Sequence, residues 1–143
     1  MKQKFSAEIT ENCAVALGVG LPISMKQSIM ICNAIRGLSL SKAKLILQGA
    51  IDMKRPIPFT RFVNGLGHKP GIGSGRYSIK ACNHVLMILK SAEANAQYRG
   101  LSTGNLVVKH IGAQQGPGVM RQGRSYHQAK RTHIEVVLEE VEE

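Results

Sequence analysis

The residues of this chain best suited to chemistry are four basic side chains near the C-terminus, Arg121, Arg124, Lys130 and Arg131. They lie in a segment rich in glycine and polar residues, with His127 among them and without any acidic residue. Basic side chains along an extended segment can reach successive phosphates, and arginine can bind one phosphate through two parallel hydrogen bonds. The segment therefore predicts recognition of a polyanion rather than a reaction. Without that partner we expect a solvated, disordered loop.

The charge of the whole chain points the same way. Nineteen Lys and Arg face nine Asp and Glu, for a formal net charge of +10, and residues 1–134 hold all the basic residues but only four of the acids. Such an imbalance costs self-repulsion, which a nucleic acid would relieve. The alternative is a basic protein without such a partner. Aromatic residues make up only 4% of the chain, which argues against an RNA surface built on stacked rings.

Nothing in the sequence favours catalysis, a metal or a cofactor. The histidines do not pair with cysteines or carboxylates at ligand spacing. No segment resembles a nucleophile elbow or a catalytic dyad. The three cysteines, Cys13, Cys32 and Cys82, are far apart, so we expect buried, reduced thiols of a cytosolic protein. The longest uncharged stretch, residues 12–25, is too short to cross a membrane.

A glycine run, Gly71-Ile72-Gly73-Ser74-Gly75-Arg76, invites comparison with phosphate-binding loops. Its G-x-G-x-G spacing is not a nucleotide-binding fingerprint, and no hydrophobic strand precedes it. Two interpretations stay open. The run is either a loop whose backbone lets RNA approach closely, with Lys69 and Arg76 as its charges, or a flexible connector.

Three helices are predicted by apolar residues at helical spacing and by their boundary residues. The first follows Ser24 and ends at Gly37, the second begins after Ser39 or Ser41 and stops before Pro56, and the third spans 79–99. Their expected buried residues are, in chain order, Ile29, Ile31, Cys32 and Ile35; Ala43, Leu45, Ile46, Ala50 and Ile51; and Ile79, Cys82, Leu86, Leu89, Ala92 and Ala96.

Strands are expected near the end of the chain. Residues 106–111 and 132–139 alternate or are rich in β-branched residues, and the glycine-rich segment 112–131 between them predicts a long projecting hairpin. Residues 3–9 are a weak candidate for an edge strand, and we interpret 12–22 and 60–78 as loops.

These elements predict an α+β fold in one domain, residues 1–143, with three helices packed on a small, about three-stranded antiparallel sheet. The globular body is expected over about 1–111 and 132–143, and the extended hairpin end over about 112–131.

The segment Lys90-Ser91-Ala92-Glu93-Ala94-Asn95-Ala96 has small residues on two sides of the third helix. It permits close approach of another backbone, from protein or RNA, or tight packing within the chain. The same segment resembles the third-helix signature of the large-subunit ribosomal protein L twenty-two family. Residues 34–43 are similar to that family's turn between its first two helices, and residues 130–138 to its last strand. Gln115-Gly116-Pro117 resembles its hairpin.

Residues 58–62 and 75–77 resemble the archaeal and eukaryotic branch of the family, which has a longer loop before the third helix. The resemblance covers roughly residues 24–140. It implies a structural protein of the cytoplasmic ribosome that binds large-subunit rRNA early in assembly. The body would lie beside the exit of the nascent-peptide tunnel, with the hairpin reaching toward the tunnel wall.

The implied partners are large-subunit rRNA, neighbouring large-subunit ribosomal proteins and, at the hairpin tip, the nascent chain; no membrane is involved. The tunnel-facing tip would comprise Gly116, Pro117, Gly118, Val119, Met120 and Arg121. Together, charge and resemblance predict rRNA contacts by Arg36, Lys42, Arg61, Lys69, Arg76, Lys80, Lys90, Asn95, Arg99, Arg121, Arg124, Lys130 and Arg131.

The segment between Gly116-Pro117 and Lys130 is several residues shorter than the family's usual arginine-rich run, so rRNA binding is better supported than tunnel lining. Two other functions are compatible with the residues. One is a free-standing RNA chaperone or regulator with the same basic surface. The other is a nucleotide-dependent enzyme that uses the glycine run.

Overall fold

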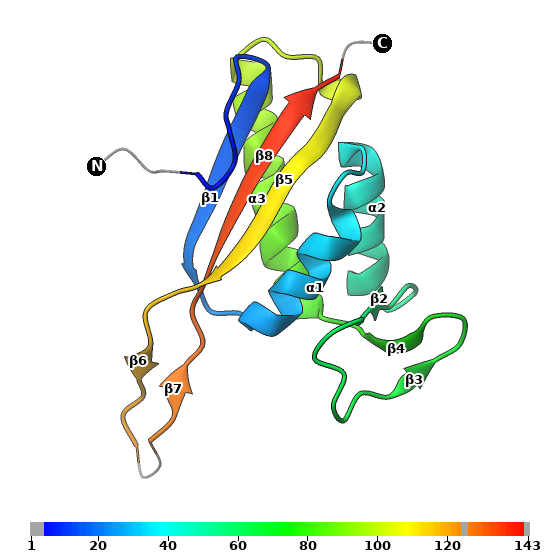
Figure 1. Ribbon diagram of the computed structural model, residues 1–143, viewed down its shortest axis with the longest axis vertical. Coiled ribbons are helices and arrows are strands. Elements are labelled where there is room, and N and C mark those ends of the chain that lie inside the picture. Colours follow the sequence, from blue (N-terminus) through cyan, green and yellow to red (C-terminus); the bar gives the residue numbers. More distant parts are fainter. Residues whose placement is uncertain (1–4, 124–125, 142–143) are drawn as a thin grey trace.

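A three-stranded antiparallel sheet with helices on one face forms the body (Figure 1). The computed structural model describes residues 5–123 and 126–141. Strand β8 (Thr132–Glu140) lies in the middle, between β1 (Cys13–Leu21) and β5 (Leu106–Gln115). The helices are α1 (Met25–Ile35), α2 (Leu40–Ile51) and α3 (Ile79–Tyr98), and a short 3₁₀ helix, η1 (Thr103–Asn105), precedes β5. The predicted α+β class is confirmed.

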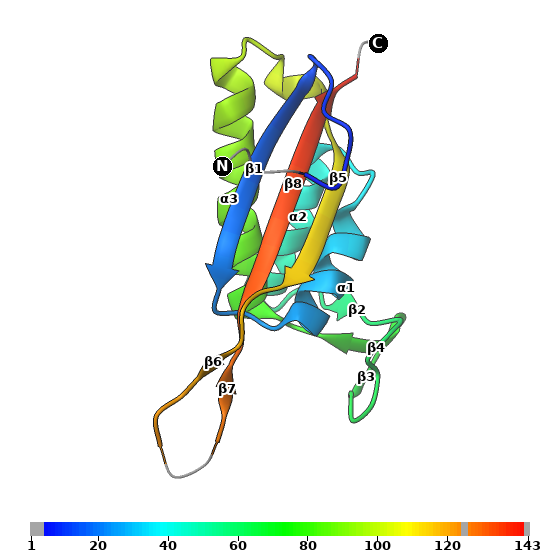
Figure 2. The ribbon, with the colours of Figure 1, turned by 60° about the vertical axis from the view of Figure 1, so that its left-hand side comes forward.

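The core lies between this sheet and the helices. Ile134, Val136 and Leu138 alternate along β8 and are fully buried, as a strand with one face on a core requires. Helix α3 lies along β1 (Figure 2), where Ala92 and Ala96 are fully buried. Ala94, between them, is exposed. For Ala92 and Ala96, the small side chains therefore serve packing within the chain.

The N-terminal prediction was wrong. Residues 12–22 were expected to be a loop, but β1 occupies 13–21, and residues 5–9 form no strand. Ala14, Ala16 and Gly18 alternate toward the helices, and a Cβ on Gly18 would lie 2.5 Å from Ile88 Cδ1. The residues are small because α3 lies so close, and the sequence therefore lacks the large alternating side chains by which a strand is recognised.

The helix boundaries are close to those predicted, but the buried faces differ. Leu45 is 72% exposed and Ile79 is 38% exposed, although both were expected in the core. Ser24, Ser39 and Ser78 hold the N-cap positions without a capping hydrogen bond from their side chains. The apolar residues that are buried in the helices include several that the expected stripes omitted: Met30, Leu40, Leu47, Ala81, Val85 and Ile88.

The segment between α2 and α3 is more regular than the loop expected there. β2 (Ile57–Pro58) pairs with β4 (Gly73–Arg76), which also pairs with β3 (His68–Lys69). Gly71 and Gly73 have φ of +81° and +73°, values that glycine adopts without steric cost. The glycine run therefore supplies part of the turn between β3 and β4 and all of β4. We call residues 53–77 the long loop.

The hairpin continues directly from β5 and β8. β5 extends to Gln115, beyond its predicted end at residue 111, and the Gly116 N–H donates to the Arg131 carbonyl at 2.9 Å. Farther out, β6 (Val119–Met120) pairs with β7 (Gln128–Ala129). The hairpin and the long loop project from the same end of the body (Figure 1), which we call the basic end.

Candidate nucleic-acid interface

The start of α1 lies between the two projections. Strand β1 runs toward the basic end and leads directly into α1, so that Ser24, Lys26 and Gln27 lie beside the base of the hairpin (Figure 1). Helix α3 also begins at this end, which brings Lys80 to the same region. Three distant segments of the sequence, the start of α1, the start of α3 and the hairpin, thus contribute basic side chains to one surface.

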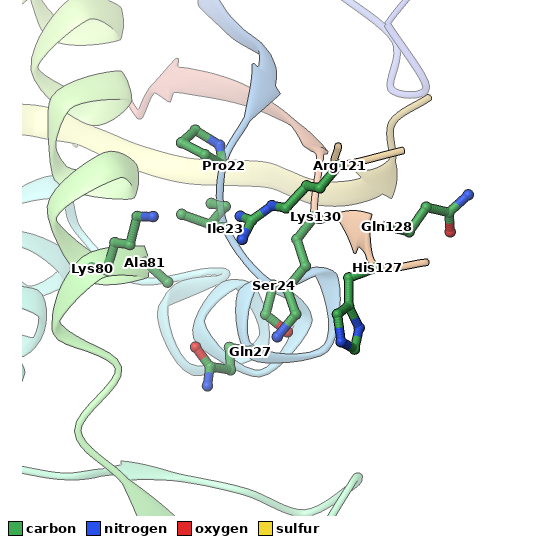
Figure 3. Close-up of a pocket in the computed structure, with 10 residues that line it drawn as sticks. All are labelled: Pro22, Ile23, Ser24, Gln27, Lys80, Ala81, Arg121, His127, Gln128 and Lys130. Atoms are coloured by element: carbon green, nitrogen blue, oxygen red, sulfur yellow. The ribbon is translucent and has the colours of Figure 1, made fainter. Parts of the chain in front are cut away.

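A groove of about 440 Å³ separates the hairpin from the body on one side. We call it the Arg121 groove. Figure 3 shows Arg121 and Lys130 extending from the hairpin toward the start of α1, with Lys80 across from them on α3. Three cationic side chains thus surround a space open to solvent. Its lining residues are Pro22, Ile23, Ser24, Gln27, Lys80, Ala81, Arg121, His127, Gln128 and Lys130.

A second groove, of about 370 Å³, lies at the base of the hairpin. We call it the Arg131 groove, and its cationic side chains are Lys26, Lys130 and Arg131. Lys130 lines both grooves. Gly116 and Gly118 also line the second groove. A Cβ on Gly116 would meet Arg131 and one on Gly118 would meet Gln128, so both glycines permit close packing within the hairpin.

Acidic side chains do not neutralise these grooves. In the described parts of the chain, the ion pairs are Lys44–Glu93 at 2.5 Å, Lys54–Asp52 at 4.0 Å, Lys109–Glu139 at 2.5 Å and His110–Glu135 at 3.0 Å. None of them involves a basic side chain of either groove. The grooves therefore carry a local positive potential that a polyanion would satisfy with release of counterions.

The long loop carries three of the predicted residues, Arg61, Lys69 and Arg76. Lys69 Nζ lies 5.3 Å from the centre of the Tyr77 ring, and Arg61 Cζ lies 5.1 Å from that of Phe62. Arg76 is exposed on β4. Arg61 and Lys69 of the loop thus rest on aromatic rings rather than on carboxylates.

Other predicted residues are used within the fold. Arg99 Nη1 donates to the Cys13 carbonyl at 2.5 Å, and Asn95 Nδ2 donates to the Val15 carbonyl at 2.8 Å. Both carbonyls belong to the edge strand β1, so these side chains occupy backbone acceptors that would otherwise be open to another strand. Arg36 Nη2 donates to the Ile111 carbonyl of β5 at 2.8 Å.

Lys42 and Lys90 are exposed on α2 and α3 and line neither groove. Lys90 borders a separate depression between the two helices, with Leu45 and Leu86. Arg124 lies outside the described residues. The structure thus brings Lys80, Arg121, Lys130 and Arg131 together, adds Arg61, Lys69 and Arg76 on the neighbouring projection, and separates the others.

The tip predicted to face the tunnel lies along one side of the hairpin. Gly116, Pro117 and Gly118 connect β5 to β6, and Val119 and Met120 form β6. The Arg121 N–H donates to the His127 carbonyl at 2.9 Å, so Arg121 is still paired with the opposite side of the hairpin.

Sequence reasoning missed Lys26 and Gln27. Lys26 lies in the first turn of α1, in a segment whose other residues signalled a helix start rather than a binding surface. Its proximity to the hairpin depends on β1 delivering the chain to the basic end, and β1 was not predicted.

The cysteines are buried, as expected. Burial raises the pKa of Cys32 to about 12 and that of Cys82 to about 11, so both are protonated thiols at neutral pH. Over residues 5–123 and 126–141, no three His, Cys, Asp or Glu side chains gather in a way that could hold a metal ion. In those same ranges, none of the helices combines the length and hydrophobicity that a membrane crossing needs.

Comparison with known proteins gives a consistent answer. Residues 16–139 match the family model described as ribosomal protein L22p/L17e. A protein of Methanocaldococcus jannaschii named large ribosomal subunit protein uL22 is 39% identical over 149 residues, covering 97% of this chain and 96% of that protein.

Proteins of the same name from Archaeoglobus fulgidus and Thermoplasma acidophilum are 40% and 41% identical, over 82% and 78% of this chain and 77% and 74% of their own lengths. The family match begins eight residues before the expected boundary at residue 24, since it takes in part of β1. The chain belongs to the ribosomal protein L22p/L17e family, a family of structural ribosomal components rather than enzymes.

Proposed function

We propose that this chain is a structural constituent of the large ribosomal subunit whose basic end binds large-subunit rRNA. One observation carries the proposal: the two grooves beside the hairpin gather Lys26, Lys80, Arg121, Lys130 and Arg131 without a neutralising carboxylate. A surface of this kind binds the phosphate backbone of a nucleic acid and positions the protein on it.

The hairpin itself orders on rRNA in this proposal. Val119 and Met120 are 47% and 55% exposed, so the described part of the hairpin gains little from packing against the body. An external partner would supply the missing contacts. Residues 116–121 would then run toward the tunnel wall and the nascent chain, while the body contacts neighbouring ribosomal proteins in the cytoplasmic ribosome.

A triple substitution tests rRNA binding. Lys80→Gln, Arg121→Gln and Lys130→Gln together remove the three cations of the Arg121 groove. The matched control, Lys44→Gln, Lys54→Gln and Lys109→Gln, removes the same charge from side chains that pair with acids. Binding of a large-subunit rRNA transcript is measured against salt concentration.

The slope of log K against log salt is negative, and each lost phosphate contact should reduce its magnitude by ~0.7–0.9, so the magnitude should fall by about 2 or more in the groove variant. The control should lose much less. An equal decrease of the salt slope in both variants would indicate that net charge, and not the grooves, causes the binding. Co-sedimentation separates a subunit component from a free RNA chaperone, which would stay out of the large-subunit fraction at moderate salt.

A further inference from the structure

Two basic side chains from separate parts of the chain lie against one aromatic ring at the basic end. Lys26 Nζ is 5.5 Å from the centre of the Phe62 ring, and Arg61 Cζ is 5.1 Å from it. Lys26 belongs to the first turn of α1 and Arg61 to the long loop. We call these three residues the Phe62 clamp, because the ring joins the helix to the loop.

The ring of Phe62 is a fixed platform. Phe62 has φ of +58°, and it shares this left-handed backbone with one other non-glycine residue of the described chain, Met53. A bulky residue keeps such a conformation only where its surroundings enforce it. Here the half-buried ring packs against the hydrophobic core. The body thus determines where the two cations gather.

The two cations have no acidic partner. Both side chains are exposed, and no carboxylate of the described residues lies within ion-pair distance of either. The electron-rich face of the ring attracts each cation but leaves its charge intact. Two like charges held beside one ring repel each other, and an anion between or beside them would relieve that repulsion.

The clamp also continues a cationic surface. Lys26 lines the Arg131 groove together with Lys130 and Arg131. The positive surface therefore passes from the base of the hairpin, across the start of α1, to Arg61 on the long loop. An extended polyanion fits this arrangement better than a single small anion.

We propose that the Phe62 clamp is a phosphodiester-binding site in which Phe62 is a positioning residue that holds Lys26 and Arg61 against the backbone of one RNA strand. The inference rests on the proposed binding of rRNA and adds to it a site, its ligand chemistry and the residue that organises it.

Phe62→Leu is the decisive variant, because leucine keeps an apolar side chain but lacks the aromatic face. Phe62→Tyr keeps the face and is its matched control. The measurement is the salt dependence of binding to a large-subunit rRNA transcript, with the melting temperature of each variant recorded.

We expect Phe62→Leu to reduce the magnitude of the slope of log K against log salt by about 1.4–1.8, since both phosphate contacts are lost. Phe62→Tyr should match the unsubstituted protein. Lys26→Gln and Arg61→Gln should each reduce the magnitude of the slope by ~0.7–0.9 when made alone. In the Phe62→Leu background, either substitution should change the slope little further.

An unchanged salt slope in Phe62→Leu overturns the proposal. Two such results are possible: the melting temperature falls while the slope stays the same, or the affinity for RNA falls while the slope stays the same. The first result would make the ring a packing residue, and the second would indicate base stacking. If the unsubstituted protein itself fails to bind the transcript, the proposed rRNA binding is wrong. Weaker binding by a clamp variant alone would not contradict the proposed rRNA binding.

Discussion

The two ends of this molecule use basic side chains in opposite ways. Around the far ends of α3 and β1, Arg99 donates to a backbone carbonyl of the edge strand, as does the neutral amide of Asn95, and Lys109 pairs with Glu139. At the basic end, the cations of both grooves lack acidic partners, and Lys26 and Arg61 rest on an aromatic ring. Position in the fold, rather than residue type, separates cations that hold the protein together from cations available to a ligand.

Among the changes that compare the two ends, removing the hairpin should have the largest effect on binding. Replacing residues 117–129 with an Asn-Gly turn would join Gly116 to Lys130, whose neighbour Arg131 is already paired with Gly116. The variant loses Arg121 and Arg124, so we expect roughly tenfold to hundredfold weaker binding of rRNA and a salt slope smaller in magnitude by about 1.4–1.8.

The melting transition of this variant should stay cooperative and near that of the full chain, because the core lies outside the hairpin. Calorimetry provides the check. A lost transition would mean that the hairpin belongs to the folding unit, and the contrast between the two ends would then fail.

Breaking the contacts at the far end should change stability and not the salt dependence of binding. Arg99→Ala leaves the Cys13 carbonyl without its donor, and we expect about 1 kcal/mol lower unfolding free energy, discounted for the exposure of Arg99. Urea unfolding measures the loss, and Arg121→Ala on the hairpin is the control expected to leave stability unchanged. A less steep salt dependence of RNA binding in Arg99→Ala would indicate that Arg99 also contacts RNA.

The smallest effect expected concerns Glu135, on the sheet face opposite the helices. Burial by itself raises the pKa of this carboxyl, but hydrogen bonds from Ser6 and His110 outweigh burial, and the net pKa is lower than usual. A folded-state pKa below the unfolded value of 4.5 contributes stability that is fully present above that pH and is lost as pH falls through the folded pKa.

Glu135→Gln should therefore flatten the acid side of the stability curve and leave rRNA binding at neutral pH unchanged. Urea midpoints across the acid range, compared with Glu139→Gln, would test this. An acid limb as steep in Glu135→Gln as in the unsubstituted chain would assign the pH dependence to other carboxyls.

The ribosomal protein family could be predicted from contiguous stretches of the sequence. The charge imbalance, the acid-free stretch around the hairpin and the family signature all lie in contiguous sequence, and they sufficed to predict an RNA-binding ribosomal protein. The three helices followed from periodicity and boundary residues. Strand β1 did not, because Ala14, Ala16 and Gly18 are small to accommodate α3, a contact between segments distant in sequence.

The sequence by itself determined that the chain is strongly basic, α+β and equipped with a cationic hairpin. Only the tertiary structure decided which cations are available to a ligand. Arg99 differs from Lys26 and Lys80 because it donates to the Cys13 carbonyl, 86 residues away along the chain, and the neutral amide of Asn95 likewise donates to Val15, 80 residues away. The path of β1 and the crossing of α3 bring such partners together, and no local pattern of residue types records that proximity.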